Sequence, residues 1–384
     1  MGVRVLAVFP VDLSRTDNIG VSVKCLALLR AARASGLTVD AAFAVGNHIC
    51  VLPHDERPGT IQDFLSVDSS PPRMRSLRAR WFRYAGYWSA VSQVLSSDYA
   101  AVWVRAFPLS ISQAAFLRHA ARASTLVYDL PTYPTRAEAS GIARLLYSFV
   151  DGARASVLRR NCSRVVTLSA HDRIAGVATL RVRNGVDQLS DALEGHTVRR
   201  TGEYVLVATG QWAHWHGLDR ILHALERLRR PYRLEVYGKG PELASLKALA
   251  KRLDVRVHWH EPVVDARLSA ALAEADVAIG TLGIHRKGVS PDRSLKHRTY
   301  AAHGLPFVAT PLDDTWDGLA GVWQVPSTEE PIDPEGLRAF LQLSRKHRNE
   351  WRRALLERAA SQTWLHTYAP LWRYFAGLGQ ADNQ

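Results

Sequence analysis

Two basic clusters in the C-terminal half of the chain have the residue types and spacing that phosphate binding needs. Lys296 and Arg298 stand at the predicted start of a short helix within SLKHRTYAAHGLPFVAT (294–310), where side-chain charge and free backbone N–H groups can meet one anion. Arg286 and Lys287 follow the strand predicted just upstream. Because loops at strand ends are the ligand edge of an α/β sheet, we expect a doubly charged phosphate ligand here. The alternative is a solvated, charged surface around an ordinary helix–strand turn.

Two glycine-containing turns could face the same ligand. GQWAHWHG (210–217) joins a predicted strand to a helix, where Gly210 allows a close turn and Gly217 lets the backbone approach a ligand at the helix N-terminus. His216 could donate a hydrogen bond to a phosphate oxygen from that position. Gly238, within YGKGP (237–241), lies in a second turn that could face a nucleotide.

Polar residues also follow two predicted strands in the N-terminal half. Arg105 comes directly after the strand Ala101–Val104, and Asp129 ends the strand Thr125–Asp129. Both therefore belong to the carboxyl edge of a predicted sheet, and both are candidates for positioning an acceptor hydroxyl. Other chemistries lack a signal, since no P-loop, HExxH or GxSxG motif occurs and the 15 histidines form no ligand-spaced cluster.

Composition favours anionic partners and a reducing compartment. The chain has 384 residues and a net charge of +13, which suits nucleic acid, anionic lipid or phosphorylated substrates without choosing among them. Its three cysteines are scattered, which argues against a disulfide framework. MGVRVLAVFP is typical of a first buried strand rather than a signal peptide, and no run is long enough to span a bilayer. We expect a cytoplasmic protein.

Strands alternate with helices in both halves, which predicts an α/β fold with two βαβ-type domains. We place the N-terminal domain at 1–190 and the C-terminal domain at 200–360, with a polar linker between them and an aromatic-rich helix at 364–384 that crosses back to the first domain. A helix is expected after the strand Val165–Ser169, and residues 50–72 are expected to be irregular.

A basic segment at 73–95 carries an aromatic stripe. Leu77, Trp81, Tyr84 and Trp88 fall on one helical face, and arginines lie off it. Such a helix could rest on an anionic membrane, but the same stripe is typical of a helix packed on a core, which is the reading we favour.

Several motifs together resemble one family. The chain is similar to GT-B retaining glycosyltransferases, which have two Rossmann-like domains, and specifically to the GT4-like members that build bacterial surface polysaccharides. The motifs that carry the resemblance are RAFP (105–108), YDLPTYPTRAE (128–138), VRNGVD (182–187), VATGQWAHWHGLDRIL (207–222), YGKGPE (237–242), GIHRKGVSPDRSLK (283–296) and LKHRTYAAHGLPFVAT (295–310).

The resemblance implies that a nucleoside-diphosphate sugar is held between the two domains, mostly by the second, with neither metal nor cofactor. The motifs and strand ends together give three candidate sets. The catalytic set is Lys296, His216 and Asp129; the donor-binding set is Gly210, Gly217, Gly238, Arg286, Lys287, Arg298, Thr299 and Tyr300; the acceptor-side set is Arg105, Thr132 and Glu138.

The chain departs from the family's pattern at two places. Gln211 and His216 stand where the family usually has Arg and Lys, and Pro291 and Thr299 stand where it usually has two glutamates, the second of which holds the ribose. Thr299 offers only a neutral hydrogen bond, for which neighbouring charged residues could compensate.

Three functions follow as hypotheses. The first is transfer of a sugar to a glycan or lipid-linked acceptor, with peripheral contact to an anionic membrane at its inner face and no nucleic-acid partner. The second is a degenerate, non-catalytic partner in a polysaccharide-assembly complex. The third and weakest is a basic nucleic-acid binder.

Overall fold

The computed structural model describes residues 3–15, 19–46, 48–59, 77–107, 110–135, 142–187, 202–228, 231–288, 293–311 and 313–381. The chain forms two compact units, of which unit 1 comprises residues 1–183 and 364–384 and unit 2 comprises residues 184–363. The chain thus leaves unit 1 after Arg183 and returns to it at Trp364. The linker predicted between 190 and 200 lies outside the described residues.

Unit 1 is built on a mostly parallel sheet with the strand order β3-β2-β1-β4-β5-β6-β8-β7. Its central strands are short runs of Val, Ala, Leu and Phe that are buried on both faces, as parallel strands between two helical layers must be. The strands are β1 (Arg4–Asp12), β2 (Thr38–Val45), β3 (His48–Leu52), β4 (Ala101–Arg105), β5 (Thr125–Asp129), β6 (Arg164–Thr167), β7 (Arg173–Ile174) and β8 (Val177–Arg181).

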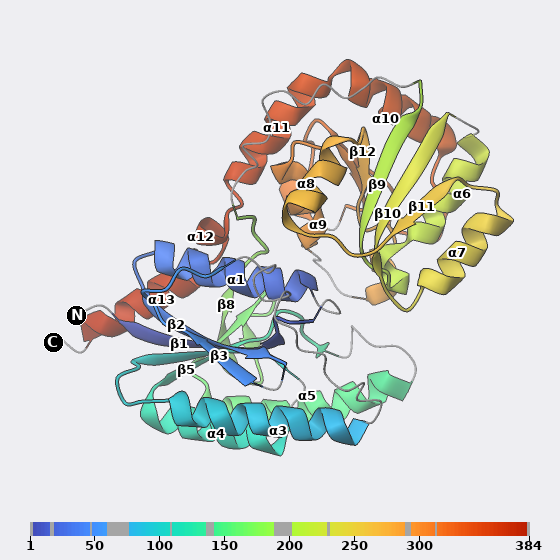
Figure 1. The fold of residues 1–384 in the computed structure, drawn as a ribbon. Helices are drawn as coiled ribbons and strands as arrows, with labels where there is room; N and C mark the ends of the chain where they lie inside the picture. Colours follow the sequence, from blue (N-terminus) through green and yellow to red (C-terminus); the bar gives the residue numbers. More distant parts are fainter. Residues whose placement is uncertain are drawn as a thin grey trace. The chain divides into compact units, whose positions relative to one another are not determined.

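Helices cover both faces of this sheet (Figure 1). α3, α4 and α5 lie along one face, and α1 and α13 lie along the other. The returning segment therefore contributes a helix to unit 1. The bounds are α1 (Ile19–Ala34), α3 (Leu77–Val94), α4 (Ile111–Ala123), α5 (Ile142–Asn161), α12 (Trp364–Thr367) and α13 (Ala369–Ala381).

Three stretches of unit 1 bear on predictions made from the sequence. The prediction of a helix after β6 is wrong. Gly176, at φ +83°, instead turns the chain into the antiparallel pair β7–β8. Part of the segment expected to be irregular pairs instead as β3 with β2. In the aromatic stripe, Trp88 is only 1% exposed and its ring lies 5.3 Å from that of Phe116, which supports the core reading at that position. The side chains of 77–84 lie outside the described residues.

Unit 2 has a six-stranded parallel sheet with the order β11-β10-β9-β12-β13-β14. On α6, Leu218, Ile221, Leu222 and Leu225 recur at helical spacing and are buried against one face of this sheet. α9 and α11 pack on the other face. The strands are β9 (Tyr204–Gln211), β10 (Tyr232–Lys239), β11 (Val257–His260), β12 (Val277–Ile279), β13 (Phe307–Ala309) and β14 (Val322–Gln324).

The helices of unit 2 are α6 (Leu218–Leu228), α7 (Leu243–Arg252), α8 (Asp265–Ala273), α9 (Leu295–Ala302), α10 (Pro334–Lys346) and α11 (Arg348–Ala360). Two Rossmann-like units, each with its own core, confirm the predicted fold class. Among the described helices, none is both long and apolar enough to pass through a bilayer.

Candidate functional site

The candidate site lies at the carboxyl edge of the sheet in unit 2. From β9 the chain adds β10 and β11 on one side of the sheet, whereas β12 lies on the other side, so the loops after β9 and β12 diverge at a topological switch point. Such a point is where open α/β sheets bind ligands. The loop after β9 forms the 3-10 turn η2 (His214–His216), and the loop after β12 leads to a second 3-10 turn, η3 (Ile284–Lys287).

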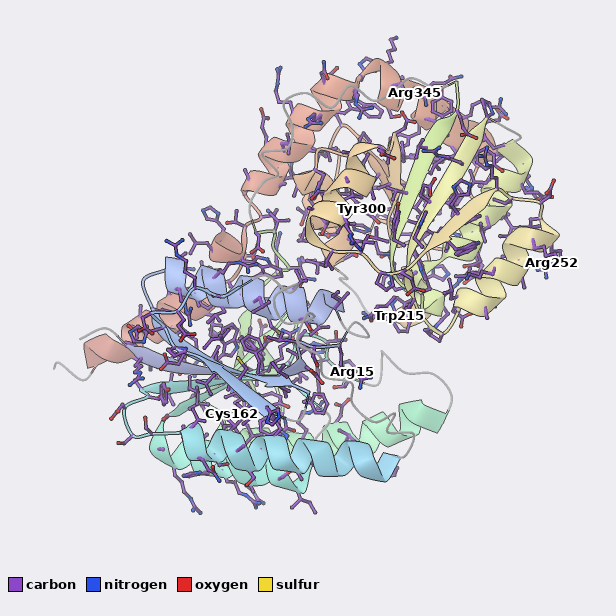
Figure 2. The ribbon with its side chains drawn as sticks, in the orientation of Figure 1. Arg15, Cys162, Trp215, Arg252, Tyr300 and Arg345 are labelled. Atoms are coloured by element: carbon purple, nitrogen blue, oxygen red, sulfur yellow. The ribbon has the colours of Figure 1, made fainter. Side chains whose placement is uncertain are left out.

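The two loops are joined by backbone contacts. The Leu282 N–H donates to the His216 carbonyl oxygen at 2.9 Å. Trp215 marks this end of unit 2 in Figure 2, and Arg345 marks the opposite end. Arg345 there binds Asp276 and the Glu203 carbonyl, which lie just before β12 and β9. The predicted basic clusters therefore belong to one end of the sheet, and the structural ion pair of Arg345 belongs to the other.

Lys296 and His216 converge on Gly210. A Cβ placed on Gly210 would lie 3.2 Å from Lys296 Nζ and 3.7 Å from His216 Nε2, so the missing side chain leaves these two nitrogens next to the backbone at the end of β9. Lys296 Nζ also lies 5.3 Å from the centre of the Trp212 ring, a cation–π contact that fixes its direction. Three sequence-predicted residues thus share one place.

His216 is a neutral hydrogen-bond donor. Its Nδ1 accepts the Ala213 N–H at 3.0 Å, which leaves the ring proton on Nε2, the nitrogen beside Gly210. Burial, followed by the positive charges of Lys296 and Lys287, holds the pKa of His216 well below its usual value. Hydrogen bonds to the Ala213 and Gln211 backbone oppose this shift without overcoming it, so the ring is uncharged at neutral pH and the positive charge of the site comes from lysine.

Two glycines let the loops pack closely. Gly217 has φ +67°, and any Cβ there would collide with the Gly283 backbone, so the entry into α6 requires glycine. A Cβ on Gly238 would collide with the Gly210 carbonyl oxygen. The structure thus explains both glycines by close contact between loops. It assigns neither of them a contact with a ligand.

Two carboxylates bind the side chain of Arg286, whereas the sequence predicted that it would contact the donor. Its guanidinium donates to both carboxylate oxygens of Asp219, at 2.8 and 2.7 Å, and to both of Glu329, at 2.7 and 2.6 Å. It also donates to the His214 carbonyl oxygen at 2.9 Å. These partners raise its pKa, and hydrogen bonds from Arg286 and then His285 lower the pKa of Glu329 to about 2. The Arg286 side chain is committed to tying η3 to η2 and α6 rather than to a donor.

Lys287 keeps a position suited to an anion. Its Nζ lies 5.7 Å from the centre of the Trp215 ring, and its charge contributes to the lowered pKa of His216. Lys287 and Lys296 therefore flank the same imidazole from η3 and α9.

Arg298 and Tyr300 are internal, which corrects their prediction as donor contacts. Arg298 is fully buried, and it donates to Asp313 at 2.7 Å and to Thr315 Oγ1 at 3.2 Å. The Tyr300 hydroxyl is buried against Thr209 and the Ile279 carbonyl oxygen, and burial raises its pKa to about 12. Both face inward because they lie on the side of α9 that packs on the sheet.

Thr299 and Pro291 stand at the two positions where the family usually has glutamate. Thr299 is half-buried, and its hydroxyl donates to the Leu295 carbonyl oxygen at 3.2 Å, within the same helix. Its hydrogen-bonding capacity is thus partly used by the backbone. Pro291 lies outside the described residues.

His297 was missed by sequence reasoning. It is 2% exposed, and its Nε2 accepts the Thr281 N–H at 3.0 Å while its ring stacks on Phe307 at 5.3 Å. A Cβ on Gly280 would lie 2.5 Å from that nitrogen, so the ring fits only because residue 280 is glycine. In the sequence, a glycine at the end of a strand and a histidine that follows a lysine indicate such a contact only weakly. The fold brings Gly280 and His297 together.

In unit 1, Asp129 and Arg105 form a buried ion pair at 2.7 Å. Asp129 is fully buried, so its carboxylate faces Arg105 rather than the surface, which argues against direct contact with a substrate. Burial alone would lower the pKa of Arg105, but Asp129 outweighs it and the pKa is raised. Thr132 is half-buried in the loop that follows β5, and Glu138 lies outside the described residues.

Over the described ranges, no group of three or more His, Cys, Asp or Glu side chains is placed to hold a metal ion.

Comparisons with known proteins bear on the fold of the chain. Residues 203–332 match the family model described as "Glycosyl transferases group 1". HepE of Anabaena, solved with UDP and glucose, has a TM-score of 0.62 at 13% identity over 99% of this chain and 100% of that one. The trehalose-6-phosphate synthase OtsA has a TM-score of 0.63 at 12% identity over 98% and 99%.

A UDP-forming α,α-trehalose-phosphate synthase from Burkholderia xenovorans, solved with glucose-6-phosphate, has a TM-score of 0.61 at 13% identity over 97% of this chain and all of that one. No curated protein matches the chain in sequence. The fold is therefore GT-B over essentially the whole chain. The segment that matches the group 1 glycosyltransferase model, residues 203–332, lies within unit 2, which also holds the candidate site.

Proposed function

We propose that this chain is a retaining, GT4-like glycosyltransferase that moves a sugar from a nucleoside-diphosphate donor to a hydroxyl group of a glycan or lipid-linked acceptor. The observation that carries the proposal is the convergence of Lys296 Nζ and His216 Nε2 on Gly210, at the switch point of the sheet. The UDP and UDP-glucose complexes of HepE support a donor of this class.

The chemistry follows from charge. When the sugar–phosphate bond breaks, negative charge develops on the departing diphosphate, and preplaced positive charge and hydrogen-bond donors stabilise it. Lys296 supplies the charge, His216 supplies a neutral N–H from Nε2, and Lys287 adds a second charge nearby. In this proposal basic side chains take the part that a metal ion plays elsewhere, and the transfer retains the anomeric configuration.

Further parts of the proposal concern the acceptor. The motifs at 105–108 and 128–138 support a role in surface polysaccharide biosynthesis. Thr132 and Glu138 remain candidates for contacts with the acceptor, while the Arg105–Asp129 pair joins the ends of β4 and β5. We place the protein at the inner face of a membrane, where a lipid-linked acceptor is accessible.

Isothermal titration of UDP, GDP and their sugar nucleotides into the full chain tests the donor class. We expect one nucleotide series to bind with a dissociation constant in the micromolar range, about as tightly as enzymes of central metabolism hold their substrates. Absence of heat from all of them at millimolar concentration would overturn the enzymatic proposal.

A second candidate function is a non-catalytic partner in a polysaccharide-assembly complex. It is favoured by one observation: Arg286 is committed to Asp219 and Glu329, so it does not replace the carboxylate that is missing at Thr299. The two functions separate in cells that lack this chain. If a Lys296→Ala variant restored glycan production fully, the scaffold would be favoured, whereas loss of restoration at unchanged protein level would favour the enzyme.

A further inference from the structure

The outward faces of α4 and α5 carry matching stripes of residues. On α4, Ile111, Ala115, Arg118 and Arg122 are all exposed and fall at i, i+4, i+7 and i+11, which places them on one side of the helix. On α5, Phe149, Ala153, Ser156 and Arg160 are exposed at the same spacing. Among the side chains that the structure describes, each stripe thus combines one large apolar residue with small residues and arginine.

The two stripes lie side by side. α4 and α5 are in contact, and each follows one of the neighbouring parallel strands β4 and β5, so both helices run in the same direction. Their first turns accordingly lie at the same end of the sheet. Figure 1 shows both helices on one face of unit 1, with α3 beside them.

The apolar ends of these stripes are not used by the core. Ile111 is 87% exposed and Phe149 is 79% exposed, far above the other exposed large apolar side chains in the described part of the chain, of which the next is Leu343 at 41%. The core side of the same helices is instead filled by Phe116, Leu117 and Leu158. Folding of unit 1 thus gives no reason for Ile111 and Phe149 to be large and apolar.

The charged side chains around the stripes are almost all positive. Arg118, Arg122, Arg159 and Arg160 are exposed, and the only acid within the described lengths of α4 and α5 is Asp151, which pairs with Arg154 at 3.0 Å. The sequence of α3 contains no acid either. A cationic helical face that also exposes bulky apolar side chains is complementary to a surface of anionic head groups above hydrocarbon.

We infer that the α4–α5 face binds the surface of an anionic phospholipid membrane. The arginines meet head-group phosphates, and Ile111 and Phe149 insert at the boundary with the acyl chains. The small residues between them let the helices approach the surface closely. Nucleic acid fits less well, because a phosphate backbone rewards the arginines but leaves both large apolar side chains in water. The inference does not depend on the proposed donor.

Vesicle flotation of the full-length chain tests this surface. We expect the protein to float with vesicles of phosphatidylcholine mixed with phosphatidylglycerol, and not with phosphatidylcholine alone. Replacing Arg122 and Arg160 together by Gln should weaken partitioning about 25-fold, since each arginine near such a surface contributes about fivefold. Phe149→Ser should weaken it about tenfold and should leave the salt dependence unchanged.

The matched control is Arg252→Gln, which removes an exposed arginine at the end of α7 in unit 2 (Figure 2) and should leave partitioning unchanged. Circular dichroism checks that every variant is folded. Equal flotation of the Arg122/Arg160 double variant and the wild-type chain would overturn the inference. So would tight, salt-dependent binding of duplex DNA by a chain that does not float with anionic vesicles.

Discussion

At the scale of single residues, the candidate site depends on the placement of two nitrogen atoms. Lys296 Nζ and His216 Nε2 both lie next to Gly210 because that residue has no side chain, and the Ala213 N–H fixes the tautomer of the imidazole. A protonated His216 would add charge, but burial and two lysines keep it neutral. The site therefore offers directional hydrogen bonding from His216 and charge from lysine.

His297 should make the stability of unit 2 depend on pH. Burial, and then the charges of Lys296 and Arg298, lower its pKa to about 3 from an ordinary 6.5, although Asp313 opposes this. In the unfolded chain the imidazole takes up a proton as the pH falls below 6.5, whereas the folded protein does not, so the free energy of unfolding decreases from that pH down to about 3.

A His297→Gln variant tests this, because its amide can still accept the Thr281 N–H. We expect urea unfolding of the variant to show a shallower loss of stability on acidification than that of the wild-type chain. Half-buried His303 and His216, whose pKa values are also lowered, leave part of the slope in place. Identical slopes in the two proteins would contradict the assignment of a neutral, buried His297.

At the scale of elements, the two arginines of η3 and α6 fasten the loops of the site. Arg286 joins η3 to η2 and α6, and Arg220 joins α6 to Leu282 and to the carbonyl oxygens of Pro326 and Glu330. The loops that carry Lys287 and His216 are thereby held in one arrangement before any ligand binds. Preorganisation of this kind reduces the cost of ordering the site on binding.

An Arg286→Met variant should therefore weaken donor binding without removing a donor contact. We expect a loss of about 1–3 kcal/mol in stability, because Asp219 and Glu329 lose their shared cation, and a severalfold rise in the dissociation constant. Arg252→Met is the matched control on an exposed helix end. If Arg286→Met lost all binding while the stability stayed unchanged, Arg286 would have to contact the donor directly.

Sequence patterns predicted the elements well where the apolar period was clear. The strands β1, β2, β4–β6 and β9–β13 and the helix α6 were predictable, because a buried parallel strand or an amphipathic helix is encoded locally, whereas β3 and β14 were not predicted. The β7–β8 pair was not, since a two-residue strand has no period and depends on the turn at Gly176. Within the site, the placement of Gly210, His216 and Lys296 was anticipated from motifs.

The roles of the other basic residues could not be predicted in the same way. Arg286 and Arg298 carry charge in the right segments, yet Asp219, Glu329 and Asp313 come from distant parts of the chain to neutralise them. A linear motif shows which residues are charged, but not which of them meet an acid in the fold. His297 was missed for the same reason, because its partner Thr281 lies on another loop.

At the scale of the whole molecule, each unit has its own core, and the candidate donor site belongs to one of them. A ligand stabilises only the part that binds it. Calorimetry should therefore resolve two unfolding transitions, of which only one moves to higher temperature with a bound nucleotide.

Two core substitutions assign those transitions. Leu225→Ala in unit 2 and Leu126→Ala in unit 1, both at fully or nearly fully buried positions, should each lower one transition, at a cost of about 2–5 kcal/mol. We expect the nucleotide to raise the transition that Leu225→Ala lowers. A shift of the Leu126 transition alone would place the donor in unit 1 and contradict the account.

The most direct test of the site is a calorimetric titration of the best-binding nucleoside diphosphate into the wild-type chain and into Lys296→Ala, with Lys251→Ala on the exposed side of α7 as the control. Loss of a charge-assisted contact of about 1.5–3 kcal/mol predicts a dissociation constant about 10 to 100 times higher for Lys296→Ala and an unchanged one for Lys251→Ala. Equal affinity of Lys296→Ala and the wild-type chain would show that the diphosphate does not bind beside Gly210.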